Sequence, residues 1–424
     1  MQGIRRLITR ASYCEKAMEL LFLSHEIPSP AASDTLSLYH LIGHLSALYG
    51  HDVTLITFAS DRSRAEDLAH LKNICSVENP IKIQWSSRKK LLLKAVKNSI
   101  LNLPKNLRRG LCLNELDYYY DCRMDQAIKE AVKKNHYELI FSTRQMANYV
   151  VDVDTPKIVQ PFDAMFEWHR QIFANSRGLN RIGSSIRYAL NRSYEKHIYE
   201  KFDVCLVVTQ LDKELLESLN PRIRCVVIPI GVDVDYFSPM DIDEEPASLT
   251  FLARLQYPVA IANVVYFYNE VFPLIRRESP NVKLSIVGRN PTEEIIALSA
   301  DPSVSVTGYV KDVRPYLAKS TVFVSPEILG TGMKYKVLEA MSMGKAVVTT
   351  PIGAQGLSVK NLEHLVVAGT SHEFARETVS LLYDRRMRAT LGANARKLVE
   401  EHYSWETVTK AVNASITNIV SEQA

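Results

Sequence analysis

The sequence predicts an α/β fold made of two doubly wound, Rossmann-like domains. Its 424 residues exceed what one ordinary core holds, and 46% of them are hydrophobic, which is enough for two cores. Short apolar runs alternate with helical patterns along the chain, which is typical of parallel sheets covered by helices. A polar, acidic stretch at 239–248 separates two such series.

In the first half, short apolar runs predict strands, and helical stretches separate most of them. The clearest helix is 33–49, where apolar residues recur at helical spacing until Gly50 ends the run. The predicted strands are 18–24, 53–58, 81–85, 138–142, 157–160, 203–208 and 224–229. We assign 16–238 to an N-terminal domain.

The second series follows the predicted linker 239–248, and we assign 249–403 to a C-terminal domain. Its predicted strands are 249–253, 282–287, 304–307, 322–325 and 346–350. A last helix, 404–424, comes after the second sheet is complete and can cross back to the first domain. Two doubly wound domains joined this way are expected to face each other across a cleft, with ligands at the carboxyl ends of the strands.

Composition excludes several other classes of protein. The formal charge of +4 is far below the dense basic footprint of a nucleic-acid binder. No segment approaches the roughly 20 uninterrupted apolar residues that a membrane-spanning helix needs, and we expect no signal peptide. The six cysteines are scattered without metal-ligand spacing, which indicates a reducing, cytoplasmic setting and no structural metal.

The basic residues cluster in one place. Between residues 88 and 109 there are eight Lys or Arg and no Asp or Glu, interleaved with apolar residues. This pattern suits a basic amphipathic helix on an anionic membrane surface, which would make the protein peripheral on the inner face of the cell membrane. A solvated helix face that covers its own domain explains the pattern equally well.

The most informative stretch is 330–348, where a loop with two glycines precedes a helix. The amino terminus of a helix attracts anions, and Lys334 and Lys336 lie beside it to neutralise a diphosphate. Glu339 falls two turns into the helix, where a carboxylate accepts two hydrogen bonds from a ribose diol. A local cap or salt bridge explains Glu339 as well, and the spacing alone favours that local role.

The run from Lys336 reads K-V-L-E-A-M-S-M-G-K-A-V-V-T-T-P-I-G and resembles the donor-site signature of glycosyltransferase family 4, a group of retaining enzymes with the GT-B fold. Similar motifs are V-I-P-I-G-V-D-V-D-Y-F at 227–237 and V-S-V-T-G-Y-V-K-D-V at 304–313. The segment 267–276 is similar to bacterial sugar transferases of exopolysaccharide synthesis. The resemblance spans nearly the whole chain and implies a GT-B glycosyltransferase that uses a nucleoside-diphosphate sugar and no other cofactor.

The resemblance implies a role for each matching residue of the donor domain. Glu339 would hold the ribose hydroxyls, and the amides around Gly332 and Met333 would face the diphosphate. Arg254 would pair with a phosphate, as would Lys334 or Lys336. The residues that would approach the base or ribose are Gly288, Tyr309 and Val310.

Some positions depart from the pattern of the family. The first of its two glutamates falls on Thr331, so the carboxylate that touches the donor sugar is missing there. Its lysine after the first strand of the donor domain is missing too, because Gln256 and Tyr257 follow Leu255. These departures keep a non-catalytic GT-B homologue, acting as a binding or scaffold protein, as the alternative function.

The acceptor side carries a weaker signal. Asp163 follows a predicted strand end and resembles an acidic position of the subgroup, so it is a candidate to bind a glycan, lipid-linked or small-molecule acceptor and position its hydroxyl. Capping of the following helix is an equally good explanation. The resemblance implies retention at the anomeric carbon, and a helix terminus with Arg254, Lys334 and Lys336 would stabilise the leaving diphosphate without a metal.

Overall fold

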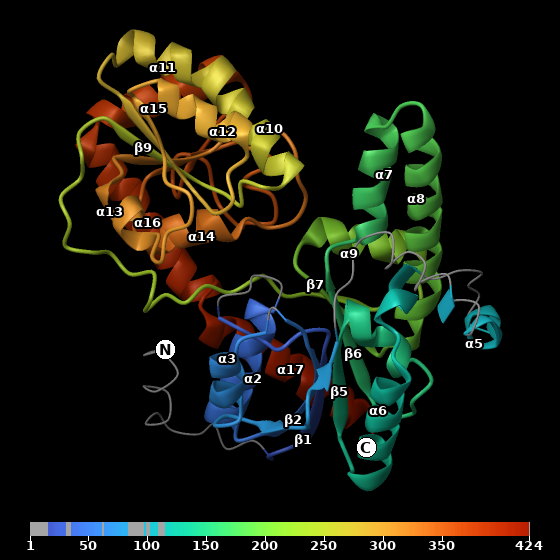
Figure 1. The fold of residues 1–424 in the computed structure, drawn as a ribbon. Coiled ribbons are helices and arrows are strands. Elements are labelled where there is room, and N and C mark those ends of the chain that lie inside the picture. Colours follow the sequence, from blue (N-terminus) through green and yellow to red (C-terminus); the bar gives the residue numbers. More distant parts are fainter. Residues whose placement is uncertain are drawn as a thin grey trace. The chain divides into compact units, whose positions relative to one another are not determined.

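In the computed structural model, residues 16–30, 35–61, 63–83, 97–98, 102–108 and 115–423 are described. The chain divides into two compact units, residues 1–228 with 409–424 and residues 229–408. The division therefore lies before the predicted boundary at 238, and the end of the last helix belongs to unit 1. Each unit contains its own parallel sheet (Figure 1).

The sheet of unit 1 has the strand order β3-β2-β1-β5-β6-β7-β8, with β4 beside β2. Its central strands are buried except at Glu19, which explains their continuous apolar sequence. The bounds are β1 Glu19–Ser24, β2 Asp52–Ala59, β3 Ser76–Val77, β4 Ile81–Lys82, β5 Leu139–Thr143, β6 Lys157–Phe162, β7 Val204–Val207 and β8 Cys225–Val227. Phe22 and Phe141 pair in register on β1 and β5 and stack at 4.8 Å.

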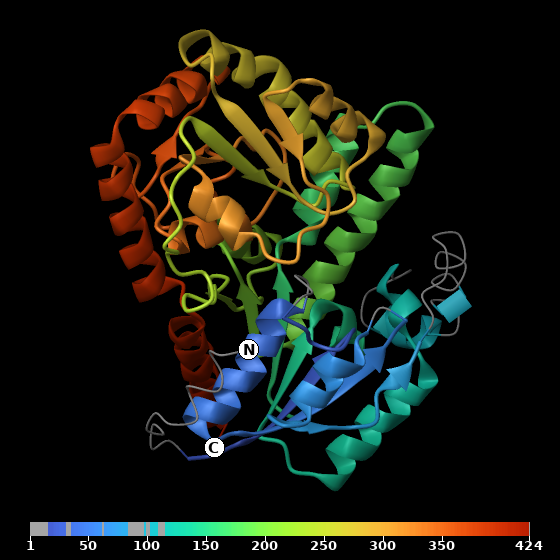
Figure 2. The same cartoon turned by 60° about the vertical axis from the view of Figure 1, so that its left-hand side comes forward.

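The helices of unit 1 are α2 Leu36–Tyr49, α3 Ala65–Leu71, α5 Leu103–Arg108, α6 Cys122–Lys134, α7 Met165–Asn175, α8 Leu179–Ile198 and α9 Gln210–Leu219. The predicted helix 33–49 corresponds to α2, which ends at Gly50 with φ 69°, a conformation that glycine adopts without strain. Residues of α6, α8 and α9 pack in one core against the sheet. Helices α7 and α8 form an antiparallel pair that extends beyond the sheet (Figure 2).

The sheet of unit 2 has the order β11-β10-β9-β12-β13-β14, and every pair is parallel. Its strands are β9 Ser248–Leu252, β10 Lys283–Val287, β11 Val304–Val306, β12 Val322–Ser325, β13 Val347–Thr349 and β14 Val366–Val367. Its helices are α10 Pro258–Tyr266, α11 Phe272–Glu278, α12 Glu293–Ala297, α13 Arg314–Lys319, α14 Tyr335–Ser342, α15 Ser371–Tyr383 and α16 Arg385–His402. The short strands β3 and β14 were not predicted.

In the described part of the chain, one helical stretch, Pro258–Glu278, is long and apolar enough to cross a membrane by length and composition. It comprises α10, a π-helical turn and α11. Phe267, Val271, Phe272 and Ile275 from this stretch are buried in the core of unit 2. Packing against the core therefore explains part of its apolar character, since 33% of its apolar 18-residue window is buried.

The chain crosses between the units twice, near residues 228 and 408. The two segments contact each other within unit 2. The amide of Val232 donates to the carbonyl of Tyr403 at 2.8 Å. A Cβ on Gly231 would lie 2.5 Å from the ring of Trp405, so only glycine fits against this buried indole. Helix α17, Trp405–Gln423, then continues into unit 1. There His51 and Asn413, both buried, make a 2.7 Å hydrogen bond.

Candidate donor and acceptor sites

The topology of unit 2 brings the predicted donor residues to one edge of the sheet. Arg254 follows β9, Gly288 follows β10, and Tyr309 and Val310 follow β11. The glycine loop follows β12 and leads into α14. Because all these strands are parallel, their carboxyl ends meet at the same edge, where doubly wound sheets bind ligands.

The glycine loop needs both of its glycines. Gly330 has φ 129° and Gly332 has φ 66°, values that side-chain-bearing residues rarely adopt. Helix α14 begins at Tyr335 with Lys334 at its N-cap, and no side chain caps it. In the part of the chain that the structure describes, the first amides of this helix are therefore available to other hydrogen-bond acceptors.

Lys334 braces the glycine loop from one side. Its Nζ donates to the carbonyl of Thr331 at 2.8 Å and to that of Gly332 at 2.6 Å. The carbonyl and amide of a trans peptide point in opposite directions, so the amides of Gly332 and Met333 point away from this ammonium group. In this conformation Lys334 therefore orients the amides that were predicted to meet the diphosphate.

Lys336 has a buried partner that the sequence reasoning missed. Its Nζ forms an ion pair with Glu327, whose side chain is only 2% exposed, and lies 4.5 Å from the ring centroid of Phe251. The Ser325 hydroxyl donates to the same carboxylate at 2.6 Å. Burial alone would raise the pKa of Glu327, but the charge and hydrogen bond of Lys336 lower it below its ordinary value. The lowered pKa favours the ionised form of the Glu327 carboxyl.

The signal for Glu327 was an acidic residue soon after an apolar strand. Glu327 lies four residues before Thr331, the position where the family pattern places its first glutamate. The comparison with that pattern therefore did not single out Glu327. The structure thus contains a carboxylate close to this loop in sequence, and that carboxylate positions a lysine.

Glu339 lies one turn after Tyr335 on α14, and both side chains are partly buried. Burial raises the pKa of Glu339 to about 7, and the nearby charge of Lys336 opposes that shift. The Tyr335 hydroxyl is buried and has no hydrogen-bond partner among the described residues. A buried donor without a partner is rare in folded proteins, so Tyr335 joins Glu339 as a candidate ligand residue.

The remaining donor residues differ in exposure. A Cβ on Gly288 would lie 1.8 Å from the carbonyl oxygen of Ala253, so this glycine is required by the adjacent loop itself. Tyr309 is 73% exposed and follows Gly308, which has φ 68°. Val310 beside it is partly buried. An exposed tyrosine on a sharp turn is available to stack on a base.

Asp163 lies in unit 1, just beyond β6. Phe162 has φ 70°, a strained value for an aromatic residue. The N-cap residue of α7 is Ala164, whose side chain makes no cap bond, and Glu195 accepts from the Phe166 amide in the first turn instead. Strain of this kind persists only where the surroundings enforce it, which is common at functional sites.

Two buried carboxylates hold the backbone beside Asp163. The amide of Ala164 donates to Asp212 at 2.9 Å, and that of Phe166 donates to Glu195 at 3.2 Å. Burial raises the pKa of Glu195 to about 7 against the opposing charge of Arg144, which lies 3.6 Å away. These contacts give Asp163 a defined backbone position.

Other predictions remain untested by this arrangement. Most of 88–109, predicted to contact a membrane, lies outside the described residues. Leu103 and Leu107 of α5 belong to its described part and are exposed. No group of three or more His, Cys, Asp or Glu in the described residues is arranged to hold a metal ion.

Two family models match the chain. The model described as "Glycosyltransferase Family 4" matches residues 36–236, and "Glycosyl transferases group 1" matches 246–384. Together they span most of both units.

Individual proteins resemble the chain at low identity. An uncharacterised 44.6 kDa protein in the cps region of Klebsiella pneumoniae is 22% identical over 410 residues, which cover 93% of this chain and 98% of the relative. A phosphatidyl-myo-inositol mannosyltransferase of Mycolicibacterium smegmatis is 25% identical over 54% of this chain and 59% of its own. The crystal structure of Anabaena HepE in complex with UDP-glucose has a TM-score of 0.61 at 14% identity, covering 95% of this chain and all of HepE.

The two parallel sheets agree with the GT-B fold of these structural neighbours, and the predicted fold class is confirmed. With the two family matches, these findings place the chain among the group 1 glycosyltransferases.

Proposed function

We propose that the protein transfers a sugar from a nucleoside-diphosphate sugar to an acceptor hydroxyl, with retention at the anomeric carbon and without a metal ion. The observation that carries the proposal is the sheet edge of unit 2, where a glycine loop braced by Lys334 precedes Glu339. HepE, which has this fold, binds UDP-glucose. A nucleoside diphosphate is therefore the donor chemistry that we propose for this edge.

In the proposed reaction, the bond between the anomeric carbon and the diphosphate oxygen breaks, and its electron pair stays on the diphosphate. The acceptor oxygen bonds to the same carbon from the leaving-group face, and its proton passes to the departing phosphate oxygen. Arg254 and the amides of Gly332 and Met333 stabilise the charge that develops there. Lys334 and Lys336 contribute fixed positive charge through the contacts already described.

On the acceptor side, we propose that Asp163 binds the acceptor and orients its hydroxyl. Its backbone position is held by the buried carboxylates of Asp212 and Glu195. We propose capsular or exopolysaccharide synthesis at the cytoplasmic face of the membrane as the setting, because the Klebsiella relative is a protein of a cps region. The acceptor in such a setting is a glycan, and a lipid-linked one is consistent with the mannosyltransferase relative, whose name specifies a phosphatidyl-inositol.

The first test is a binding screen of the purified protein against UDP-, GDP-, ADP- and TDP-sugars. Glu339→Ala should weaken binding of the preferred donor by at least tenfold, because losing hydrogen bonds from a carboxylate costs about 1.5–3 kcal/mol. Glu293→Ala, on the partly exposed first turn of α12, is the control and should bind normally. Unchanged binding by Glu339→Ala would remove the donor-site assignment.

Thr331 keeps a second function open, that of a non-catalytic homologue that binds without transfer. It occupies the position where the family places its sugar-contacting carboxylate. Slow hydrolysis or transfer of the preferred donor by the wild-type protein, lost in Glu339→Ala, excludes this function. Donor binding with no turnover in the presence of glycan acceptors supports it.

A further inference from the structure

The outward face of α8 is unusual for a helix of a soluble domain. Ile182 is 61% exposed and Ile186 is 53% exposed. Ala189, Ser193 and Lys196 follow at helical spacing, so all five residues share one face. The opposite face is buried in unit 1 through Asn191, Tyr194, Glu195 and Ile198. The exposed stripe spans about 21 Å at 1.5 Å per residue.

Cations accompany this stripe and have few acidic neighbours. From residue 165 to residue 198 the basic residues are Arg170, Arg177, Arg181, Arg187, Arg192 and Lys196, and the acidic ones are Glu167 and Glu195. Glu167 pairs with Arg170, and Glu195 is buried beside Arg144. Among the described residues, the other five cations of the pair α7–α8 make no ion pair with a carboxylate. The hairpin therefore presents net positive charge to its surroundings.

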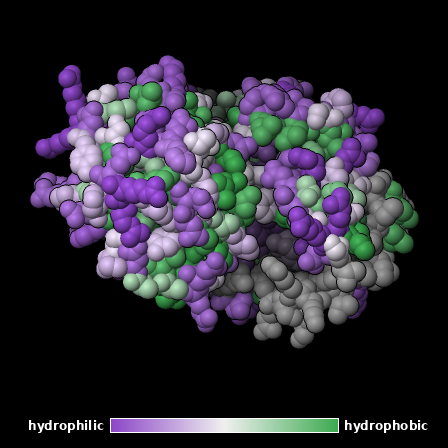
Figure 3. Space-filling view, turned by 90° about the horizontal axis from the view of Figure 1, so that it is seen from above, coloured by the Kyte–Doolittle hydropathy of each residue, from purple (hydrophilic) through white to green (hydrophobic). Residues whose placement is uncertain are grey.

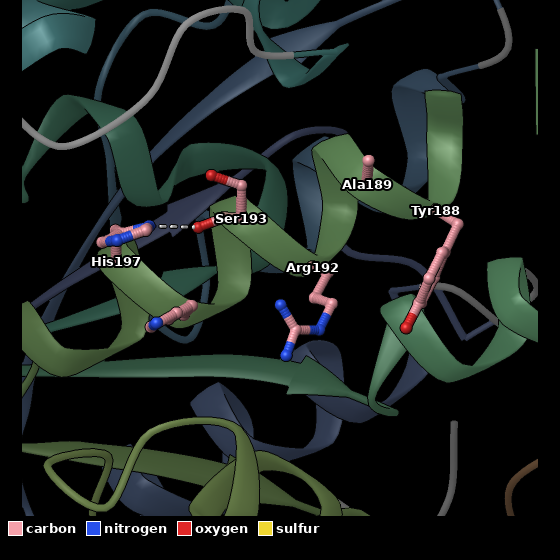
Figure 4. Close-up of a pocket in the computed structure, with 6 residues that line it drawn as sticks. Tyr188, Ala189, Arg192, Ser193 and His197 are labelled. Carbon is pink, nitrogen blue, oxygen red and sulfur yellow. Dashed lines mark hydrogen bonds between the residues drawn. The ribbon is translucent and has the colours of Figure 1, made fainter. Parts of the chain in front are cut away.

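The carboxyl-terminal half of the same face is hollowed. A depression of about 460 Å³ is lined by Tyr188, Ala189, Arg192, Ser193, Lys196 and His197. Figure 4 shows Tyr188 and Arg192 extending to the same side of the helix, and Nδ1 of His197 bonded to the carbonyl of Ser193 at 2.8 Å. The depression has room for an anionic group and offers two cations to it.

We propose that the outward face of α8 is a docking surface for an anionic lipid membrane. In this arrangement Ile182 and Ile186 enter the boundary between headgroups and acyl chains. Arg192 and Lys196 meet the phosphates of lipid headgroups in the depression. An apolar stripe flanked by arginines is the pattern of helices that lie in the plane of a membrane interface.

Charge is the reason for choosing a membrane over another protein. A second copy of this chain would bring the same cations against each other, and like charges oppose association. Hydrophilic residues cover much of the face seen in Figure 3, with hydrophobic ones in smaller groups. The proposed docking surface on α8 consists of other residues than segment 88–109. The proposal does not rest on the proposed reaction.

The test is sedimentation of the full-length protein with vesicles of phosphatidylcholine, with or without phosphatidylglycerol. Wild-type protein should bind the anionic vesicles, and this binding should weaken as salt is added. Arg192→Gln with Lys196→Gln should bind them roughly 25-fold more weakly, because each cation near an anionic surface contributes about 1 kcal/mol. Arg385→Gln with Arg386→Gln removes two exposed charges from α16 of unit 2 and should leave binding unchanged.

A second variant separates the apolar contribution from the charge. Ile182→Ser with Ile186→Ser should weaken vesicle binding at least tenfold while keeping its dependence on salt. Ile296→Ser, at a 51% exposed position of α12 in unit 2, is the control. Donor binding in solution should be the same in every variant, which distinguishes failure of this inference from failure of the proposed reaction.

Three outcomes would overturn the inference. Wild-type protein could fail to bind anionic vesicles, or the α8 variants could bind them as tightly as wild type does. Alternatively, analytical ultracentrifugation could reveal a dimer that Ile182→Ser with Ile186→Ser dissociates, which would make the face an interface between two copies.

Discussion

At the scale of single residues, Glu339 links pH to both donor binding and stability. Burial raises its pKa to about 7, so the carboxylate becomes ionised only as pH rises through that value. The ionised form accepts hydrogen bonds from both ribose hydroxyls, so donor affinity should increase between pH 6 and pH 8. Glu339→Gln should bind more weakly at pH 8 and show no such increase. Calorimetric titration measures both.

The same pKa shift acts on folding in the opposite direction. The pKa of Glu339 is higher in the folded state than in the unfolded chain, so its contribution to stability falls as pH rises from its ordinary value to about 7. At pH 8 the Glu339→Gln variant should therefore be more stable than wild type by about 3 kcal/mol. A variant less stable at pH 8 would show that the carboxylate has a stabilising partner.

Glu327 and Lys336 are expected to behave as a buried ion pair. Glu327→Gln leaves the Lys336 charge without its partner, so the free energy of unfolding should fall by about 3–5 kcal/mol. Adding Lys336→Met should restore most of that loss. Glu245→Gln breaks an exposed pair with Lys319 and should cost less than about 1 kcal/mol. Equal effects of Glu327→Gln and Glu245→Gln in thermal unfolding would contradict the burial argument.

At the scale of elements, the position of α14 depends on a close contact with α16. A Cβ on Gly392 would lie 2.0 Å from the carbonyl oxygen of Gly344, which follows α14. Gly392→Ala should therefore push the helices apart, lower stability by about 1–3 kcal/mol and weaken donor binding by moving Glu339. Gly183→Ala on α8 meets nothing within 4 Å and should stabilise by up to about 1 kcal/mol. Thermal unfolding of the two variants measures both stability changes, which should have opposite signs.

At the scale of the whole molecule, two separate cores predict two unfolding transitions. Deleting 409–424 removes Val412, Ile416 and Ile419, each almost fully buried, together with the partner of His51. Three such side chains contribute about 5 kcal/mol or more, so the transition of unit 1 should shift strongly or disappear. The transition of unit 2 and its donor binding should persist. A single cooperative transition that shifts as a whole in calorimetry would contradict this division.

The sequence by itself determined the fold class, nearly all strands and the order of elements. Buried parallel strands are continuous apolar runs, and Gly50 or the glycine loop marks where helices end or begin, so these features are readable locally. The two-residue strands β3 and β14 were missed because so short a segment carries no periodic signal. The donor motif also identified Glu339 and its loop as candidates, because their spacing along one helix is a local property.

Only the tertiary structure decided the partners of the charged groups. In unit 2 Glu327 meets Lys336, and in unit 1 Glu195 supports the backbone beside Asp163, because packing in each unit brings separate elements together. Packing also shows that the loop after β9 requires Gly288, in addition to the ligand contact predicted for this glycine. The sequence could not predict that Ile182 and Ile186 are exposed, because an apolar pair on a helix normally faces the core. Which face a helix buries is decided by long-range packing, and that information lies outside any local stretch of sequence.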